Sequence, residues 1–237
     1  QNAVPFVLIP ELKKRSDLQF IETPGIVFAY LAFNFNNPYL KNPLVRQAFA
    51  HAIDRDRIIR YKLSGVAEPA TSFMGPRHWV FNKNLKALAF DPQKAKALLD
   101  AAGFKDPDGD GPLPRFKLTY KTSSLKERIE IAQLIAEQLS AVGVELDVRP
   151  YEFGTLFRDV RQGNFDVYTL TWSGITDPDI YYSICHSKMM PPNGANRGHY
   201  VSAQMDKLLE KSRVTLDRNE QKKIYDEIQE IALNDLV

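Results

Sequence analysis

The chain has 237 residues, of which 44% are hydrophobic and 25% charged, a balance typical of a globular protein with a sizeable core. Its 31 basic and 29 acidic residues leave a formal net charge of +2, too small to indicate a nucleic acid or membrane surface as partner. No stretch reaches the roughly 18–20 apolar residues of a spanning helix, and the single cysteine, Cys185, excludes an internal disulfide and a cysteine-based zinc cluster.

The amino-terminal part is predicted to contain one strand followed by two helices. Residues 26–35, IVFAYLAFNF, are rich in β-branched and aromatic residues and almost continuously apolar, which indicates a strand buried on both faces. Pro43 suits the first position of a helix. Asp54 can cap a second helix, which ends near Gly65.

The rest of the chain predicts a long loop and then strands alternating with helices. Residues 66–90 have no period and hold several prolines and aromatics, so a loop is expected there. Beyond it, strands and helices that alternate imply parallel pairing with right-handed crossovers, hence an α/β fold with a βαβαβ core. The expected strands are 116–121, 144–148 and 165–172, and the expected helices are 92–102, 129–142, 152–162, 202–213 and 217–233.

One short motif suggests catalysis, but it is incomplete. Ser123-Ser124-Leu125-Lys126 matches the S-x-x-K pattern of penicillin-recognising serine enzymes, and the S-D-N and K-T-G motifs that accompany it are missing. A serine that caps the following helix explains the same residues. We therefore predict that the chain is not an enzyme and has no catalytic residue.

The candidate metal ligands are also incomplete. The acidic run 106–110 copies the first half of a calcium loop, but Lys117 stands where the bidentate glutamate is required. The four histidines form no i, i+4 pair, so a site would need folding to join His186 with His199. No metal and no cofactor are predicted.

The segment 172–182, WSGITDPDIYY, is the strongest candidate for ligand binding. It begins at the carboxyl end of a predicted parallel strand, where open α/β sheets bind their ligands. Trp172 supplies an aromatic surface, Gly174 allows close backbone approach, and Asp177 and Asp179 supply carboxylates. A strand-to-helix turn capped by one of these aspartates explains the same residues, and position alone leaves both interpretations open.

Residues 34–55, NFNNPYLKNPLVRQAFAHAIDR, resemble the signature of the dipeptide- and oligopeptide-type solute-binding proteins of family 5. In that family a strand ending in FN precedes a VRQA…AIDR helix. Four further segments agree in order: DPQKAKALL with AGF, then DPDGDG, then GNFD leading into Trp172, and finally NRGHY followed by DKLL. Together they span about residues 25–232.

The resemblance implies one lobe of a two-lobed type II periplasmic-binding-protein fold, with a mixed sheet and flanking helices. Residues 1–25 would be a lead-in or hinge segment from a missing amino-terminal lobe. Residues 26–237 would be the carboxyl-terminal ligand-binding lobe, a single domain truncated at both ends, with the signal peptide lost upstream.

The implied function is that of the substrate-binding component of an ABC transporter. The protein would capture a peptide or peptide-like solute in the periplasm and present it, as a monomer, to an inner-membrane permease. Relatives also carry nickel complexes, haem, sugars and opines, so the resemblance leaves the identity of the solute open. The alternative is a ligand-sensing domain of a transcription regulator, because some regulators contain this pair of lobes behind a DNA-binding head.

The resemblance also implies which residues line the cleft. In peptide-binding relatives a tryptophan on this strand is followed three residues later by an aspartate that pairs with the amino terminus of the peptide. Trp172 matches the tryptophan, whereas Ile175 stands in the place of the aspartate and Asp177 is the candidate substitute. The expected ligand-binding residues are Trp172, Ser173, Gly174, Ile175, Asp177, Asn34 and Asn36.

Overall fold

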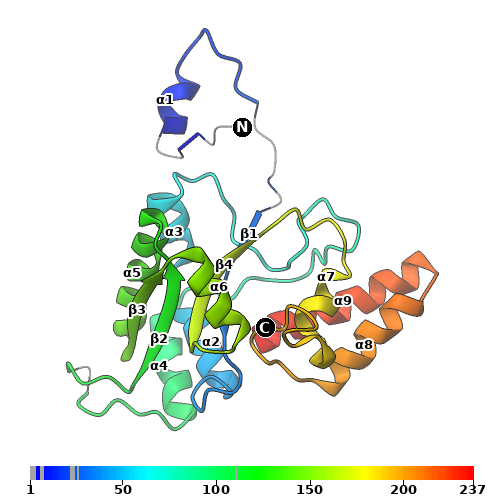
Figure 1. Cartoon of the computed structure of the whole chain (residues 1–237). Coiled ribbons are helices and arrows are strands. Elements are labelled where there is room, and N and C mark those ends of the chain that lie inside the picture. Colours follow the sequence, from blue (N-terminus) through cyan, green and yellow to red (C-terminus); the bar gives the residue numbers. More distant parts are fainter. Residues whose placement is uncertain (1–3, 6–7, 22–24, 26, 110) are drawn as a thin grey trace.

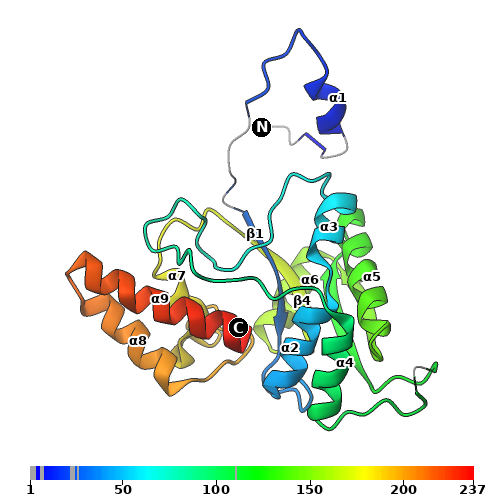
Figure 2. The same ribbon diagram turned by 180° about the vertical axis from the view of Figure 1, so that it is seen from behind.

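The computed structural model describes residues 4–5, 8–21, 25, 27–109 and 111–237. Figures 1 and 2 show a twisted sheet covered by helices on both faces, with a second group of helices from the carboxyl-terminal part beside it. The elements are α1 (Ile9–Lys13), β1 (Val27–Phe33), α2 (Pro43–Ala52), α3 (Arg55–Lys62), α4 (Pro92–Ala101), β2 (Phe116–Ser123), α5 (Lys126–Ser140), β3 (Val144–Tyr151), α6 (Phe153–Arg161), β4 (Val167–Ser173), α7 (Ile180–Cys185), the 3₁₀ turn η2 (Ser187–Met189), α8 (Ala203–Val214) and α9 (Arg218–Asp235).

The sheet has the strand order β1-β4-β2-β3. Strand β2 pairs in parallel with β3 and with β4, whereas β1 runs antiparallel to β4. The predicted α/β class, with a parallel core inside a mixed sheet, is therefore confirmed. Because β2, β3 and β4 point the same way, their carboxyl ends meet at one edge of the sheet.

The prediction that the first strand is buried on both faces is wrong. Within β1 only Phe33 is buried, and the side chain of Val27 is 65% exposed. The strand lies at the edge of the sheet, and its Tyr30 side chain lines a partly open hollow and not a closed core. Residue 26, the predicted start, lies outside the described residues.

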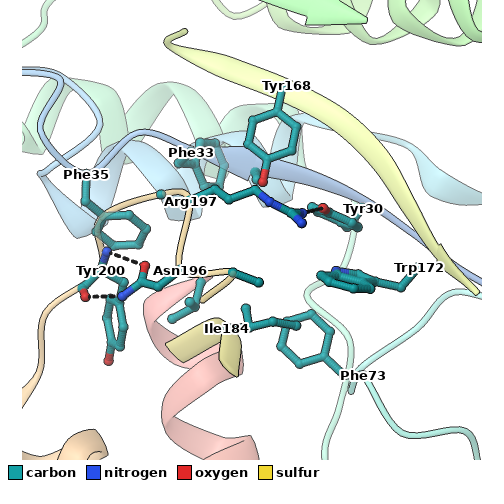
Figure 3. Close-up of a pocket in the computed structure, with 14 residues that line it drawn as sticks. Tyr30, Phe33, Phe35, Phe73, Tyr168, Trp172, Ile184, Asn196, Arg197 and Tyr200 are labelled. Carbon is teal, nitrogen blue, oxygen red and sulfur yellow. Dashed lines mark hydrogen bonds between the residues drawn. The ribbon is translucent and has the colours of Figure 1, made fainter. Parts of the chain in front are cut away.

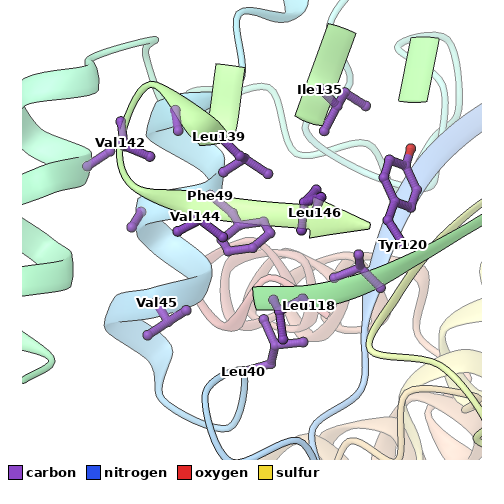
Figure 4. Packing of buried hydrophobic residues seen from close by; sticks show 14 of the residues in the cluster. Leu40, Val45, Phe49, Leu118, Tyr120, Ile135, Leu139, Val142, Val144 and Leu146 are labelled. Atoms are coloured by element: carbon purple, nitrogen blue, oxygen red, sulfur yellow. The ribbon is translucent and has the colours of Figure 1, made fainter. Parts of the chain in front are cut away.

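The main core lies between the sheet and helices α2 and α5. Tyr120 of β2, Phe49 of α2 and Leu139 of α5 are completely buried in it (Figure 4). On the predicted amphipathic helix, the buried side chains recur at spacings of three and four, as helix geometry requires for one face. The alternation in β2 likewise places Phe116 and Leu118 in this core.

A side chain caps the amino terminus of most helices, but not that of α5. Asp54 accepts a hydrogen bond from the Arg57 amide, as predicted for the start of α3. At α5 the residue before the helix is Leu125, which provides no side-chain cap. The Ser124 amide donates to the Tyr151 carbonyl at 2.7 Å, because this segment continues its pairing with β3. The expectation that a serine caps this helix is therefore wrong.

A second core joins the long loop to the carboxyl-terminal helices. Met74 and Val80 from the loop are buried among residues of α7, α8 and α9. The loop has no helix or strand over 66–90, as predicted, yet it is firmly held. Gln229 of α9 donates to the Val80 carbonyl at 2.8 Å and accepts from the Asn82 amide at 3.1 Å.

A buried ion pair connects β2 to α6 on the opposite face of the sheet. Lys121 Nζ lies 2.7 Å from Asp159 Oδ2, and the two side chains are 7% and 14% exposed. The pair therefore differs from the surface pair of Lys117 with Glu145, which joins β2 to β3 at 2.9 Å with side chains 65% and 47% exposed.

We predict that Asp159→Asn lowers the free energy of unfolding by about 3 kcal/mol, because it leaves the Lys121 ammonium buried without a counter-charge. Glu145→Gln is the matched control and should change it by less than about 1 kcal/mol, since its pair is solvated. Denaturant unfolding of both variants measures the difference. Equal losses in the two variants would contradict a special role of the buried pair.

Candidate functional site

Exposed apolar side chains mark the edge where the parallel strands end. Leu125 follows β2 and is 67% exposed, Phe153 follows β3 and is 58% exposed, and Trp172 near the end of β4 is partly exposed. The parallel pairing places all three strand ends along one edge. Large apolar groups left open in this way usually mark a binding surface.

A small hollow lies beside Trp172 (Figure 3). Its volume is about 30 Å³, and its walls include the rings of Tyr30, Phe73, Tyr168 and Trp172. Arg197 is the one charged side chain among its lining residues. A space of this size holds about one water molecule. A larger solute would therefore lie across its mouth, with this chain as one wall.

The aromatic walls come from the antiparallel pairing of β1 with β4. Phe28 is the register partner of Trp172. The Phe28 ring stacks on Tyr30 with centroids 6.1 Å apart and meets Phe73 of the long loop edge-on at 5.0 Å. The aromatic content of β1, interpreted from sequence as a sign of burial, thus belongs to this partly open surface.

Arg197 is the functional candidate that sequence reasoning missed. Its guanidinium carbon lies 5.0 Å from the ring centroids of both Trp172 and Phe157. It donates a hydrogen bond to the Tyr30 hydroxyl at 3.3 Å. Burial raises the pKa of Tyr30 although the charge of Arg197 acts in the opposite direction, so the phenol is neutral at physiological pH. In the sequence, the NRGHY segment signalled only family resemblance.

The loop that carries Arg197 is tightly fixed. Asn196 is 2% exposed, and its side chain accepts from the Tyr200 amide at 2.9 Å and donates to the Tyr200 carbonyl at 2.7 Å. A Cβ atom on Gly198 would lie 2.6 Å from the Phe33 carbonyl oxygen, so only glycine lets this loop approach β1 so closely. Arg197 is therefore held in place before any ligand arrives.

The residues predicted after Trp172 do not line this hollow. Ser173 ends β4 and is exposed, as is Gly174, whose φ of 75° lies in the left-handed region that favours glycine. Ile175 packs against the second core. Asp177 is exposed and accepts from the Asp179 amide at 2.8 Å, which shapes the turn into α7. Ligand contact by these residues stays a prediction.

The two predicted asparagines lie at the other end of β4. The Asn34 side chain is buried and donates to the Phe165 carbonyl at 2.9 Å, beside the start of the strand, whereas Trp172 is near its end. Asn36 is exposed and lies 2.9 Å from a His199 ring nitrogen. The structure therefore does not bring the asparagines together with Trp172, and it uses Asn34 to hold two chain segments together.

The remaining candidates for catalysis or metal binding are also accounted for. Asp106 accepts from the Asp108 amide at 3.1 Å, while residue 110 lies outside the described part. His186 is buried with Nε2 3.3 Å from Glu210, and so does not join His199. Among the described residues no group of three or more histidine, cysteine or acidic side chains could hold a metal ion, and no helix could cross a membrane.

The model of the bacterial extracellular solute-binding proteins, family 5 (middle), matches residues 2–188 of the chain. The chain belongs to this family. The oligopeptide-binding protein AppA of Bacillus subtilis (strain 168) is 33% identical over 239 residues, which cover 97% of this chain and 44% of AppA. The dipeptide-binding protein of Escherichia coli (strain K12) is 25% identical over 222 residues, covering 93% and 41%.

Solved structures of relatives confirm the fold. The structure of Bacillus subtilis AppA in complex with a nonapeptide superimposes with a TM-score of 0.87 at 31% identity. The match covers 98% of this chain and 47% of that one. The fold is thus that of a type II periplasmic binding protein, and the chain spans less than half the length of these family 5 relatives.

We expect Asn34→Ala to cost about 1–3 kcal/mol of stability, because it leaves buried backbone groups without partners. Asn36→Ala removes an exposed contact and should stay within about 0.5 kcal/mol of the wild type. Thermal and denaturant unfolding compare the two. An Asn34→Ala variant with unchanged stability and weakened solute affinity would instead make Asn34 a ligand contact.

Proposed function

We propose that the chain is the carboxyl-terminal lobe of a solute-binding protein that captures a peptide or peptide-like solute for an ABC importer. The observation that carries this proposal is the aromatic hollow beside Trp172, at the sheet edge where the parallel strands end. The nonapeptide bound by AppA supports the solute class, given the 31% identity.

The proposed second lobe is supported by the apolar surface that this chain leaves open. Helix α1 has no buried residue and stands apart from the sheet in both ribbon views (Figures 1 and 2). Phe20 and Ile21, close after it, are 42% and 75% exposed. We infer that residues 1–25 lead in from the other lobe and that residues 26–237 form the ligand-binding lobe described here.

Membership of the family supports the partners that we propose. The intact protein acts in the periplasm as a monomer, closes its two lobes over the solute and presents it to an inner-membrane permease. It performs no reaction on the solute. The relatives described above are binding proteins, which favours solute capture over the ligand-sensing domain of a transcription regulator.

Native mass spectrometry of the full-length protein, purified gently, tests the solute class. We expect a retained peptide or peptide-like molecule, and a much weaker complex with the isolated chain of 237 residues, because one lobe buries only part of the ligand surface. A retained sugar or haem would contradict the solute class. Equally tight binding by the isolated chain would contradict the cleft between two lobes.

Trp172→Ala in the full-length protein should weaken solute binding by about 10- to 100-fold with little change in melting temperature, because the indole contacts solute rather than core. Trp79→Ala is the matched control. Its ring packs against the second core and against Tyr225, so the loss should fall on stability. A collapse in the melting temperature of the Trp172 variant, with normal affinity of the remaining folded protein, would show that the tryptophan is structural.

A further inference from the structure

The charge of Arg197 has no counter-charge in the part of the chain that the structure describes. Its side chain donates a hydrogen bond to the Tyr30 hydroxyl, and the Tyr168 hydroxyl lies close by (Figure 3). Burial raises the pKa of both phenols, so both are neutral. No acidic side chain lies among the residues that line the hollow. A guanidinium has five N–H donors, so most of them remain available.

Other arginines of the chain satisfy their charge or their donors in different ways; buried Arg46, for example, donates to the backbone carbonyls of Asp235 and Leu40. Arg213 also lies over an aromatic ring, that of Tyr182 at 4.1 Å, but its Nε is 3.1 Å from Asp179. Arg115, whose side chain is 3% exposed, pairs with Asp100. Arg197 is partly buried between aromatic side chains and has no such carboxylate within 4 Å among the described residues. Partial removal of a cation from water raises the free energy of the protein unless an anion pairs with that cation.

The position of Arg197 is fixed by the fold. Asn196 and Gly198, on either side of it, hold the loop through a buried side chain and a close approach to β1. The Tyr30 hydroxyl holds the guanidinium itself. A fixed guanidinium recognises a planar two-oxygen group especially well, because its donors match both oxygens at once. Little conformational freedom is lost when such an anion binds.

We propose that Arg197 binds a carboxylate of the solute and places the acidic end of that solute against Trp172. This inference rests on the proposed function and adds which chemical group of the solute lies at this end of the site. The ring of Trp172, 5.0 Å from the guanidinium carbon, would contact the part of the solute next to that carboxylate. At the place where the resemblance implies an amine-pairing aspartate, Ile175 packs into the second core and offers no charge.

The test uses the full-length protein and two pools of synthetic tripeptides with the same sequences. One pool has free carboxyl termini and the other has carboxamides. Calorimetric titration should show the free-acid pool binding about 10- to 100-fold more tightly than the amide pool, the usual size of a charge-assisted hydrogen-bond contribution. Arg197→Gln should remove most of that preference. Arg197→Lys keeps the charge but loses the paired donors of the planar guanidinium, and it should retain part of the preference.

Arg218→Gln is the matched control variant. Arg218 also lies over a tryptophan, with its guanidinium carbon 4.5 Å from the Trp79 ring, but it is exposed and does not line the hollow. This variant should bind both pools as the wild type does. Melting temperatures of all variants establish that the binding differences do not come from unfolding.

The outcomes separate the two proposals. If both pools bind with equal affinity, or if Arg197→Gln leaves the preference for the free acid intact, the carboxylate inference fails while solute capture stands. A fall in melting temperature with an unchanged preference would show that Arg197 serves the fold, through Tyr30 and the neighbouring rings, and does not bind the carboxylate. If neither these pools nor matched pools of nonapeptides bind to the wild-type protein, peptide capture itself fails, and this inference fails with it.

Discussion

The antiparallel pairing of β1 with β4 is the interaction on which the rest of this structure depends. It joins segments that are far apart in the sequence, Val27–Phe33 and Val167–Ser173. It places Phe28 opposite Trp172, and the buried Asn34 side chain fastens the other end of the pair by bonding to the Phe165 carbonyl. Backbone hydrogen bonds of a sheet edge thus decide which aromatic rings meet at the candidate site.

The same pairing fixes the loop that carries Arg197. The Phe35 amide, just past β1, donates to the Gly198 carbonyl at 2.8 Å. Phe35 also packs against both hydrophobic cores, so it links the sheet to the carboxyl-terminal helices. Arg46 of α2 adds a further link by donating to the Asp235 carbonyl at 2.7 Å. The site lies where these two packed units meet, as ligand sites often do.

Two cationic side chains beside the sheet, Lys121 and Arg197, differ in whether the fold provides a counter-charge. Lys121 is buried next to Asp159 and contacts the Tyr151 ring, so its charge is balanced inside the fold. Arg197 also lies among aromatic rings, but the described fold provides it only with neutral phenols. The charge of Lys121 is thus balanced by a carboxylate of the fold, whereas that of Arg197 is left for an anionic ligand, as proposed above.

The sequence by itself determined the α/β class, nearly all of the helices and strands, and the family. These follow from local patterns: apolar periods of two and about 3.6 residues, caps such as Asp54, and the motif at residues 34–55. It also placed Trp172 at the end of a parallel strand.

Only the tertiary structure decided which residues lie beside Trp172, because β1, the loop at 195–200 and the long loop at 66–90 approach β4 through contacts between distant segments. For that reason adjacency in sequence assigned Ser173 and Asp177 to the site, while the hollow beside Trp172 is completed by Tyr30, Phe73 and Arg197.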